Sequence, residues 1–187
     1  MPRQPTLETT RLLLRPFRTS DADDVQRLAG DRGVADTTLN IPHPYEDGMA
    51  EKWILNHRDW FERREQAVFS ITLRSDGTLL GAIGLRITPD DQRAELGYWI
   101  GKPYWGQGYC TEASRAILDF GFEHLELNRI CAHHFARNAA SGRVMQKLGM
   151  THEGHLRQHV KKWDAFEDLE LYGILRSLWQ PIACHTG

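Results

Sequence analysis

Seven segments of the chain show the alternation, or the short continuous run, of apolar residues that is typical of β-strands. They are residues 12–17, 68–73, 79–87, 94–100, 129–135, about 151–156 and 169–175. Four segments have a helical period instead. They are residues 20–29, 46–64, 113–124 and 138–148, and residues 30–45 are expected to form a loop.

The order of these segments predicts the fold class. Antiparallel strands come first and strand–helix–strand units follow, so we expect an α/β (α+β) domain. Its sheet should be mixed, mostly antiparallel, of about seven strands, and flanked by helices. A chain of 187 residues with 41% hydrophobic residues suffices for one such domain with a buried core. We place this domain at residues 1–180 and a C-terminal tail at residues 181–187.

Charge and composition limit the classes of function. The net charge is −2 and no long run of one sign occurs, which favours neither a nucleic-acid partner nor a membrane surface. The chain has no apolar stretch of about 18 residues and no apolar signal core at its start, so we expect a soluble, cytoplasmic protein. The cysteines, Cys110, Cys131 and Cys184, have unrelated spacings, which argues against a disulfide framework.

The segment from Tyr104 to Ala113 carries the most specific chemistry. Gly106 and Gly108 punctuate a loop that runs directly into a predicted helix. Glycine lets backbone N–H groups point at one place and the helix adds its positive end, so the loop predicts a pyrophosphate site. A dinucleotide-binding oxidoreductase is disfavoured, because the third glycine and the preceding parallel unit are absent.

Three segments together resemble a known family. Residues 105–110, Trp-Gly-Gln-Gly-Tyr-Cys, resemble the acetyl-CoA pyrophosphate loop of the GNAT superfamily of N-acetyltransferases, with Gly108 at its invariant glycine. Residues 94–100 resemble the fourth strand of that family, and residues 138–150 its second CoA-contacting helix, in the same order. The Tyr-Trp-Gly-Gln-Gly-Tyr form resembles one branch in particular, the RimJ/RimL-like enzymes that acetylate the N-termini of ribosomal and other proteins.

The resemblance implies a single-domain GNAT fold, acetyl-CoA as co-substrate, and no metal. It puts the pyrophosphate on the loop amides and pantetheine against backbone groups of the fourth strand, where that strand splays from the fifth. An exposed N–H there would also stabilise the tetrahedral oxyanion. The implied cofactor-binding residues are Trp99, Ile100, Trp105, Gly106, Gln107, Gly108, Tyr109, Cys110, Thr111, Asn138 and Ser141.

Glu95 is the candidate general base, acting through water. Alternation places it on the face of its strand opposite Tyr98. The competing interpretation is a surface glutamate that pairs with Arg86 or Arg93. An α-amine has a pKa near 8, so a modest base suffices.

Ser141 is the candidate general acid. Many members of the superfamily carry a tyrosine at the position of Met145, and Met145 has no proton to give. In the related branch this serine lies close to the CoA sulfur. Two alternatives stay open: Ser141 only bonds backbone groups near the helix cap formed by Asn138, or the thiolate leaves unaided.

The acceptor pocket is expected between Asp36 and Trp60, where relatives shape it. His43, Tyr45 and Trp53 are the candidate substrate-binding residues. His152 and His155 have ligand-like spacing, but no cysteine or carboxylate cluster accompanies them in the sequence, so no metal site is expected.

The sequence therefore predicts direct acetyl transfer from acetyl-CoA to a primary amine in a ternary complex, without an acyl-enzyme. The favoured acceptor is a protein N-terminal α-amine, of a ribosomal or another protein. The alternatives are a small amine (polyamine, aminoglycoside or amino acid) and a CoA-binding module without catalysis. A monomer or a homodimer is expected.

Overall fold

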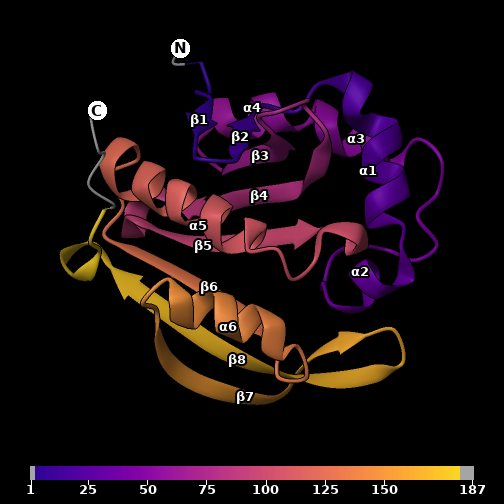
Figure 1. Cartoon of the computed structure of the whole chain (residues 1–187). Helices are drawn as coiled ribbons and strands as arrows, with labels where there is room; N and C mark the ends of the chain where they lie inside the picture. The colour runs from indigo at the N-terminus through magenta and orange to yellow at the C-terminus, as the bar shows by residue number, and fades with distance from the viewer. Residues whose placement is uncertain (1–2, 182–187) are drawn as a thin grey trace.

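A computed structural model describes residues 3–181, and these form one eight-stranded sheet with helices on both faces (Figure 1). The strand order is β1-β2-β3-β4-β5-β6-β8-β7. The strands are β1 (Leu7–Glu8), β2 (Leu12–Arg15), β3 (Gln66–Leu73), β4 (Leu79–Thr88), β5 (Arg93–Ile100), β6 (Arg129–Phe135), β7 (Thr151–Lys162) and β8 (Ala165–Leu175). The tail expected at residues 181–187 lies almost wholly outside the described residues.

Two helical layers cover the sheet. The helices are α1 (Ala22–Ala29), α2 (Arg32–Asp36), α3 (Met49–Leu55), α4 (His57–Glu62), α5 (Tyr109–Asp119) and α6 (Ala139–Lys147). Single turns of other helix types are η1 (Thr19–Asp21), η2 (Pro89–Asp91), η3 (Lys102–Tyr104), η4 (Phe120–His124) and η5 (Arg176–Leu178). The main hydrophobic core lies between the sheet and the pair α5 and α6, and a smaller cluster lies under α1 and α3 on the opposite face.

The helix expected over residues 46–64 is divided in two at Asn56. The side-chain amide of Asn56 donates a hydrogen bond to the carbonyl of Lys52, 2.7 Å away. Such local side-chain bonds compete with the helical ladder, and a new helix, α4, starts at His57.

Two further elements differ from the expectation. The expected loop contains α2, which Asp31 caps by accepting a hydrogen bond from the Gly33 amide at 2.7 Å. The two-residue strand β1 has too short a pattern to be recognised and raises the strand number to eight. The last two strands are also longer than expected and form the hairpin that extends past the body of the molecule in Figure 1.

All strand pairs are antiparallel except β5 with β6. This parallel pair joins only the first three residues of each strand, Arg93–Glu95 with Arg129–Cys131. Beyond Glu95 the two strands diverge, and a split opens in the middle of the sheet. No helix of the described residues combines the length and hydropathy that a membrane span requires.

Candidate active site

The glycine loop lies between η3 and α5, at the end of β5. Gly106 and Gly108 have φ values of 76° and 81°, a conformation that other residues adopt only with strain. Gly108 is the N-cap residue of α5. Among residues 3–181, the amide groups of residues 106–111 have no hydrogen-bond acceptor, so these donors and the helix dipole together offer a site for an anion.

Arg11 and Glu112 hold this loop in place. The Glu112 carboxylate accepts hydrogen bonds from the Thr9 hydroxyl at 2.7 Å, the Arg11 amide at 2.8 Å and Arg11 Nε at 2.7 Å. Burial alone would raise the pKa of Glu112, but these bonds outweigh burial and lower it. Arg11 also donates to the Gln107 carbonyl at 3.1 Å and lies 4.5 Å over the Tyr109 ring. A guanidinium charge therefore stands beside the expected pyrophosphate.

The split beside β5 exposes backbone groups of alternate residues. The Gly101 amide donates to the Leu80 carbonyl of β4, and the Cys131 thiol of β6 reaches the Ala94 carbonyl. The backbone N–H and C=O of one residue point to the same edge of a strand, and the edge alternates from residue to residue. Gly101 therefore faces β4, and the backbone groups of Tyr98 and Ile100 face the split, as those of Ala94 face β6. The Ile100 carbonyl is occupied by the Trp105 indole, 2.6 Å away, but its amide remains directed toward the split.

Trp99 differs from the expectation in one respect. Its backbone groups face β4, where it lies opposite Ala82, so they do not face the split. Its side chain instead packs on the α1–α3 face and lines the cavity described next. Trp105 is 45% exposed and acts through its bond to Ile100, at the end of the strand.

A cavity of about 500 Å³ passes through the split. On the α6 side it is lined by Tyr98 and Ser141, and on the α1–α3 side by Glu95, Tyr45 and Trp53. The two candidate catalytic residues, far apart in the sequence, are thus brought to one cavity. A donor group beside Ser141 and an acceptor group beside Glu95 can therefore meet within the same cavity.

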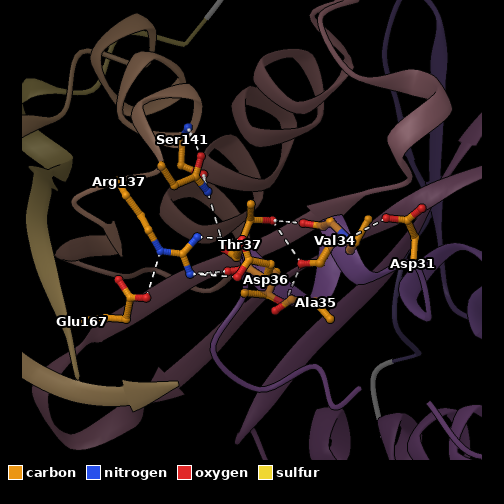
Figure 2. A network of polar contacts seen from close by, with 11 residues as sticks. Asp31, Val34, Ala35, Asp36, Thr37, Arg137, Ser141 and Glu167 are labelled. Atoms are coloured by element: carbon orange, nitrogen blue, oxygen red, sulfur yellow. Dashed lines mark hydrogen bonds and ion pairs between the residues drawn. The ribbon is translucent and has the colours of Figure 1, made fainter. Parts of the chain in front are cut away.

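Ser141 lies in the first turn of α6, where Asn138 orients it. The Asn138 side chain accepts from the Ser141 amide at 3.3 Å and donates to the Ser141 hydroxyl at 3.2 Å. Its amide also reaches the Thr37 carbonyl at 3.5 Å, which links the start of α6 to the segment after α2 (Figure 2). Because the hydroxyl accepts from Asn138, its own proton can be donated elsewhere.

Arg137 makes the second link in Figure 2. It donates to the Asp36 carboxylate at 2.8 Å, to the Asp36 carbonyl at 2.7 Å and to Glu167 of β8 at 2.9 Å. The end of α2 is therefore fixed against β8 and the start of α6. Thr37, which follows α2, lines the cavity.

Glu95 is both paired and inside the cavity. Arg86 donates to one of its oxygens at 2.7 Å, and His133 Nδ1 lies 3.2 Å from the other. Arg93, the other expected partner, pairs with Asp91 instead. The Arg86 side chain is 60% exposed, and such pairs contribute little stability. Pairing and a function as base are therefore compatible at this position.

The half-buried Tyr98 hydroxyl, which contacts Ser141, and the half-buried Cys110 thiol remain protonated at neutral pH. Burial raises the pKa of the Cys110 thiol to about 12, so it cannot serve as a thiolate nucleophile at neutral pH. Burial also raises the pKa of Tyr98 well above its usual value. The Tyr98 hydroxyl donates to the Ser141 carbonyl at 3.4 Å, a contact between residues 43 positions apart that no local pattern predicts.

The expected substrate residues separate into two groups. Tyr45 and Trp53 line the cavity, whereas His43 does not. The His43 ring lies instead against Trp163 at the tip of the β7–β8 hairpin, with 6.4 Å between ring centroids. His152 and His155 both contact Glu170, and within residues 3–181 no group of three or more His, Cys, Asp or Glu residues is placed to hold a metal ion.

Comparison with known proteins identifies the family. The family model of the acetyltransferase (GNAT) domain matches residues 11–151, three quarters of the chain. The chain belongs to the GNAT family of acetyltransferases. The matched range includes the glycine loop, β5 and α6, so the expected GNAT fold and acetyltransferase activity are confirmed.

Relatives extend this result to nearly the full chain. The "Uncharacterized N-acetyltransferase p20" of Bacillus licheniformis is 32% identical over 173 residues, which cover 91% of this chain and 96% of that protein. The ribosomal-protein-serine acetyltransferase of Escherichia coli (strain K12) is 34% identical over 95 residues, 50% of this chain and 53% of that protein. The structure of a GNAT-family acetyltransferase from Bacillus anthracis has a TM-score of 0.81 at 26% identity and covers 92% of this chain and 99% of that one.

Proposed function

We propose that this GNAT acetyltransferase moves the acetyl group of acetyl-CoA directly to a primary amine, most often a protein N-terminal α-amine. The observation that carries the proposal is the cavity that passes through the split between β5 and β6 and reaches both Ser141 and Glu95. A thioester on one side and an amine on the other can meet there without a covalent enzyme intermediate. GNAT acetyltransferases use acetyl-CoA, and one relative is a ribosomal-protein-serine acetyltransferase.

The proposed seat for acetyl-CoA consists mainly of backbone donors. Unpartnered amides from Gly106 to Thr111 bind the pyrophosphate, and Arg11 adds a positive charge beside them. The Ile100 amide and the Tyr98 carbonyl pair with pantetheine along the open edge of β5. Asn138 and Ser141 close this seat from α6.

Proton transfers in this proposal use groups on both sides of the split. Glu95 removes a proton from the ammonium or amine through water, and the amine nitrogen forms a bond to the carbonyl carbon of the acetyl group. The Tyr98 amide, which faces the split at a residue that lines the cavity, stabilises the oxyanion, and loss of such a donor costs roughly 3 kcal/mol. When the carbon–sulfur bond breaks, the Ser141 hydroxyl gives its proton to the departing sulfur and regains one from solvent.

The proposal is tested by following thiol release and product mass with acetyl-CoA and a panel of peptides and small amines. Glu95→Gln and Ser141→Ala should each lower kcat at least tenfold while the affinity for CoA stays within about threefold. Glu170→Gln and Ser177→Ala are matched controls outside the cavity, and both should keep full activity.

Three outcomes would count against parts of this proposal. Full activity of both cavity variants would refute the site assignment. Exclusive turnover of a polyamine, aminoglycoside or free amino acid would refute the N-terminal acceptor. Tight CoA binding without turnover of any amine would show a binding module instead of an enzyme reaction.

A further inference from the structure

The side of the cavity that faces Glu95 is walled by apolar side chains. They come from four different parts of the chain: α1, the segment after α2, α3 and the sheet. The residues that make up this wall include Val25, Leu39, Ile41, Met49, Trp53 and Trp99. Such a wall stabilises an apolar ligand group by removing its surface from water.

Charge is scarce in this wall. Of the described residues that line the cavity, Arg86 and Glu95 are the only Arg, Lys, Asp or Glu residues, and they pair with each other at 2.7 Å. The nearest acidic neighbours are engaged or set back. Asp36 is bound by Arg137. Glu51 has one buried oxygen without a hydrogen-bond partner among the described residues, but it is not among the residues that line the cavity. Burial and the Glu51 charge together raise the pKa of Tyr45.

We propose that the acceptor is a monoamine whose amine-bearing carbon carries a bulky apolar group. The proposal rests on the function proposed above and names the class of amine that this site takes. The amine reaches Glu95, and the apolar group lies against Trp53, Met49 and Ile41. In a peptide acceptor, this group is the side chain of a large hydrophobic first residue.

The same wall discriminates against polycations. A polyamine or aminoglycoside would bring a second ammonium into the cavity, where no unpaired carboxylate lines the wall to receive it. Removing that charge from water without a partner is costly. A small first residue such as serine or alanine leaves much of the apolar wall without contact. Because one methylene changes kcat/KM by roughly tenfold or more, we expect a clear preference.

The experiment compares kcat/KM for matched acceptors with the full-length chain and acetyl-CoA. One pair contains peptides of one sequence that begin with Phe or with Ser, and the other pair contains phenethylamine and spermidine. We expect the Phe peptide and phenethylamine to exceed their partners at least tenfold. The two pairs also distinguish a peptide acceptor from a free amine.

Two wall variants test the physical cause. Met49→Glu places a carboxylate in the wall at the first residue of α3, where the helix dipole favours an acid. It should reduce the preference for phenethylamine over spermidine at least tenfold, whereas the matched neutral variant Met49→Gln should shift it less than threefold. Glu51→Gln, a change at a residue that does not line the cavity, should leave the preference unchanged.

Trp53→Ala removes an aromatic surface from the wall. It should lower kcat/KM for the Phe peptide at least tenfold and for the Ser peptide less than threefold. Trp53 also packs on His57, so thermal unfolding must show that the variant is folded. If it does not fold, the Met49 pair decides the question.

The outcomes separate the two proposals. Acetylation of spermidine or the Ser peptide in preference to the apolar acceptors would overturn this inference and leave acetyl transfer standing. Equal effects of Met49→Glu and Met49→Gln would also overturn it. Absence of turnover with every amine, despite CoA binding, would overturn the proposed function and this inference with it.

Discussion

Protonation of His57 should make the protein lose stability in mild acid. His57 opens α4, is 5% exposed, and is surrounded by Trp53, Phe17 and Trp60 at ring-centroid distances of 4.3, 5.3 and 5.5 Å. Neither ring nitrogen has a hydrogen-bond partner among the described residues. Burial therefore lowers the pKa of His57 from 6.5 to about 4.

The sign of the effect follows from which state binds the proton first. As the pH falls, the unfolded chain protonates His57 near pH 6.5, whereas the folded protein keeps it neutral down to about pH 4. The stabilising contribution is therefore complete above pH 6.5 and is lost progressively toward pH 4. Each pKa unit corresponds to about 1.4 kcal/mol, so the full loss is about 3 kcal/mol. At about pH 5 the loss is about 2 kcal/mol, or roughly 6 °C in Tm.

The assay is urea unfolding followed by tryptophan fluorescence at a series of pH values. His57→Phe keeps the aromatic surface, removes the titration and sacrifices no hydrogen bond, so it should be close to neutral in stability above pH 7. Between about pH 7.5 and pH 5 the natural protein should lose about 2 kcal/mol more than this variant. His57→Gln, which also cannot titrate here, should resemble the Phe variant in slope. Parallel loss of stability in all three proteins would refute this account of His57.

Three further predictions concern the glycine loop, the hydrogen bonds of Arg137 to Asp36 and Glu167, and the half-buried Cys110 thiol. Gly108→Ala, at a φ of 81°, should weaken CoA binding at least tenfold by calorimetry while the fold by circular dichroism is kept, and unchanged affinity would contradict the role of this backbone conformation. Arg137→Lys keeps the charge but loses the fork that holds Asp36 and Glu167, so the acceptor KM should rise severalfold with CoA affinity unchanged. Equal changes in the acceptor KM and in the CoA affinity would argue against an effect of Arg137 on the apolar wall of the cavity. Cys110, whose pKa desolvation raises to about 12, should resist iodoacetamide at neutral pH until urea unfolds the chain, and rapid alkylation of the native protein, measured by mass spectrometry, would contradict this raised pKa.

Local patterns predicted most of the fold. Alternation in residues 94–100 correctly put Glu95 and Trp99 on the face opposite the main core, because side-chain direction in a strand depends only on parity. The break at Asn56 was missed, because the helical period continues across it and only a side-chain bond marks the division. The long β7–β8 hairpin was underestimated since most of its residues are polar on both faces.

The site was predicted as far as it lies in short motifs. The loop conformation follows from two glycines within three residues, and the Asn138 cap from its place before a helix. His43 does not line the cavity, and its place beside Trp163 at the distant hairpin tip could not be foreseen from local sequence. The contact by which Arg11 holds the loop was likewise not foreseen, because Arg11 and Glu112 lie 101 positions apart in the sequence.

The short parallel pairing of β5 with β6 has a mechanical consequence. Among residues 3–181, the strand ladders of the two parts of the sheet, β1–β5 and β6–β8, meet only at Arg93–Glu95 and Arg129–Cys131. Next to this short ladder, the Gln92 carbonyl accepts from the Asn128 and Arg129 amides. The apolar wall of the cavity contacts both parts of the sheet. It packs on the β1–β5 part through α1 and α3, and it is bound to the β6–β8 part through Arg137, Asn138 and Lys162. Under the proposed function, acetyl-CoA occupies the split between β5 and β6 and sets the angle between the two parts of the sheet. Its arrival would thereby give the amine pocket its final shape, which makes nucleotide first and amine second the natural order of addition.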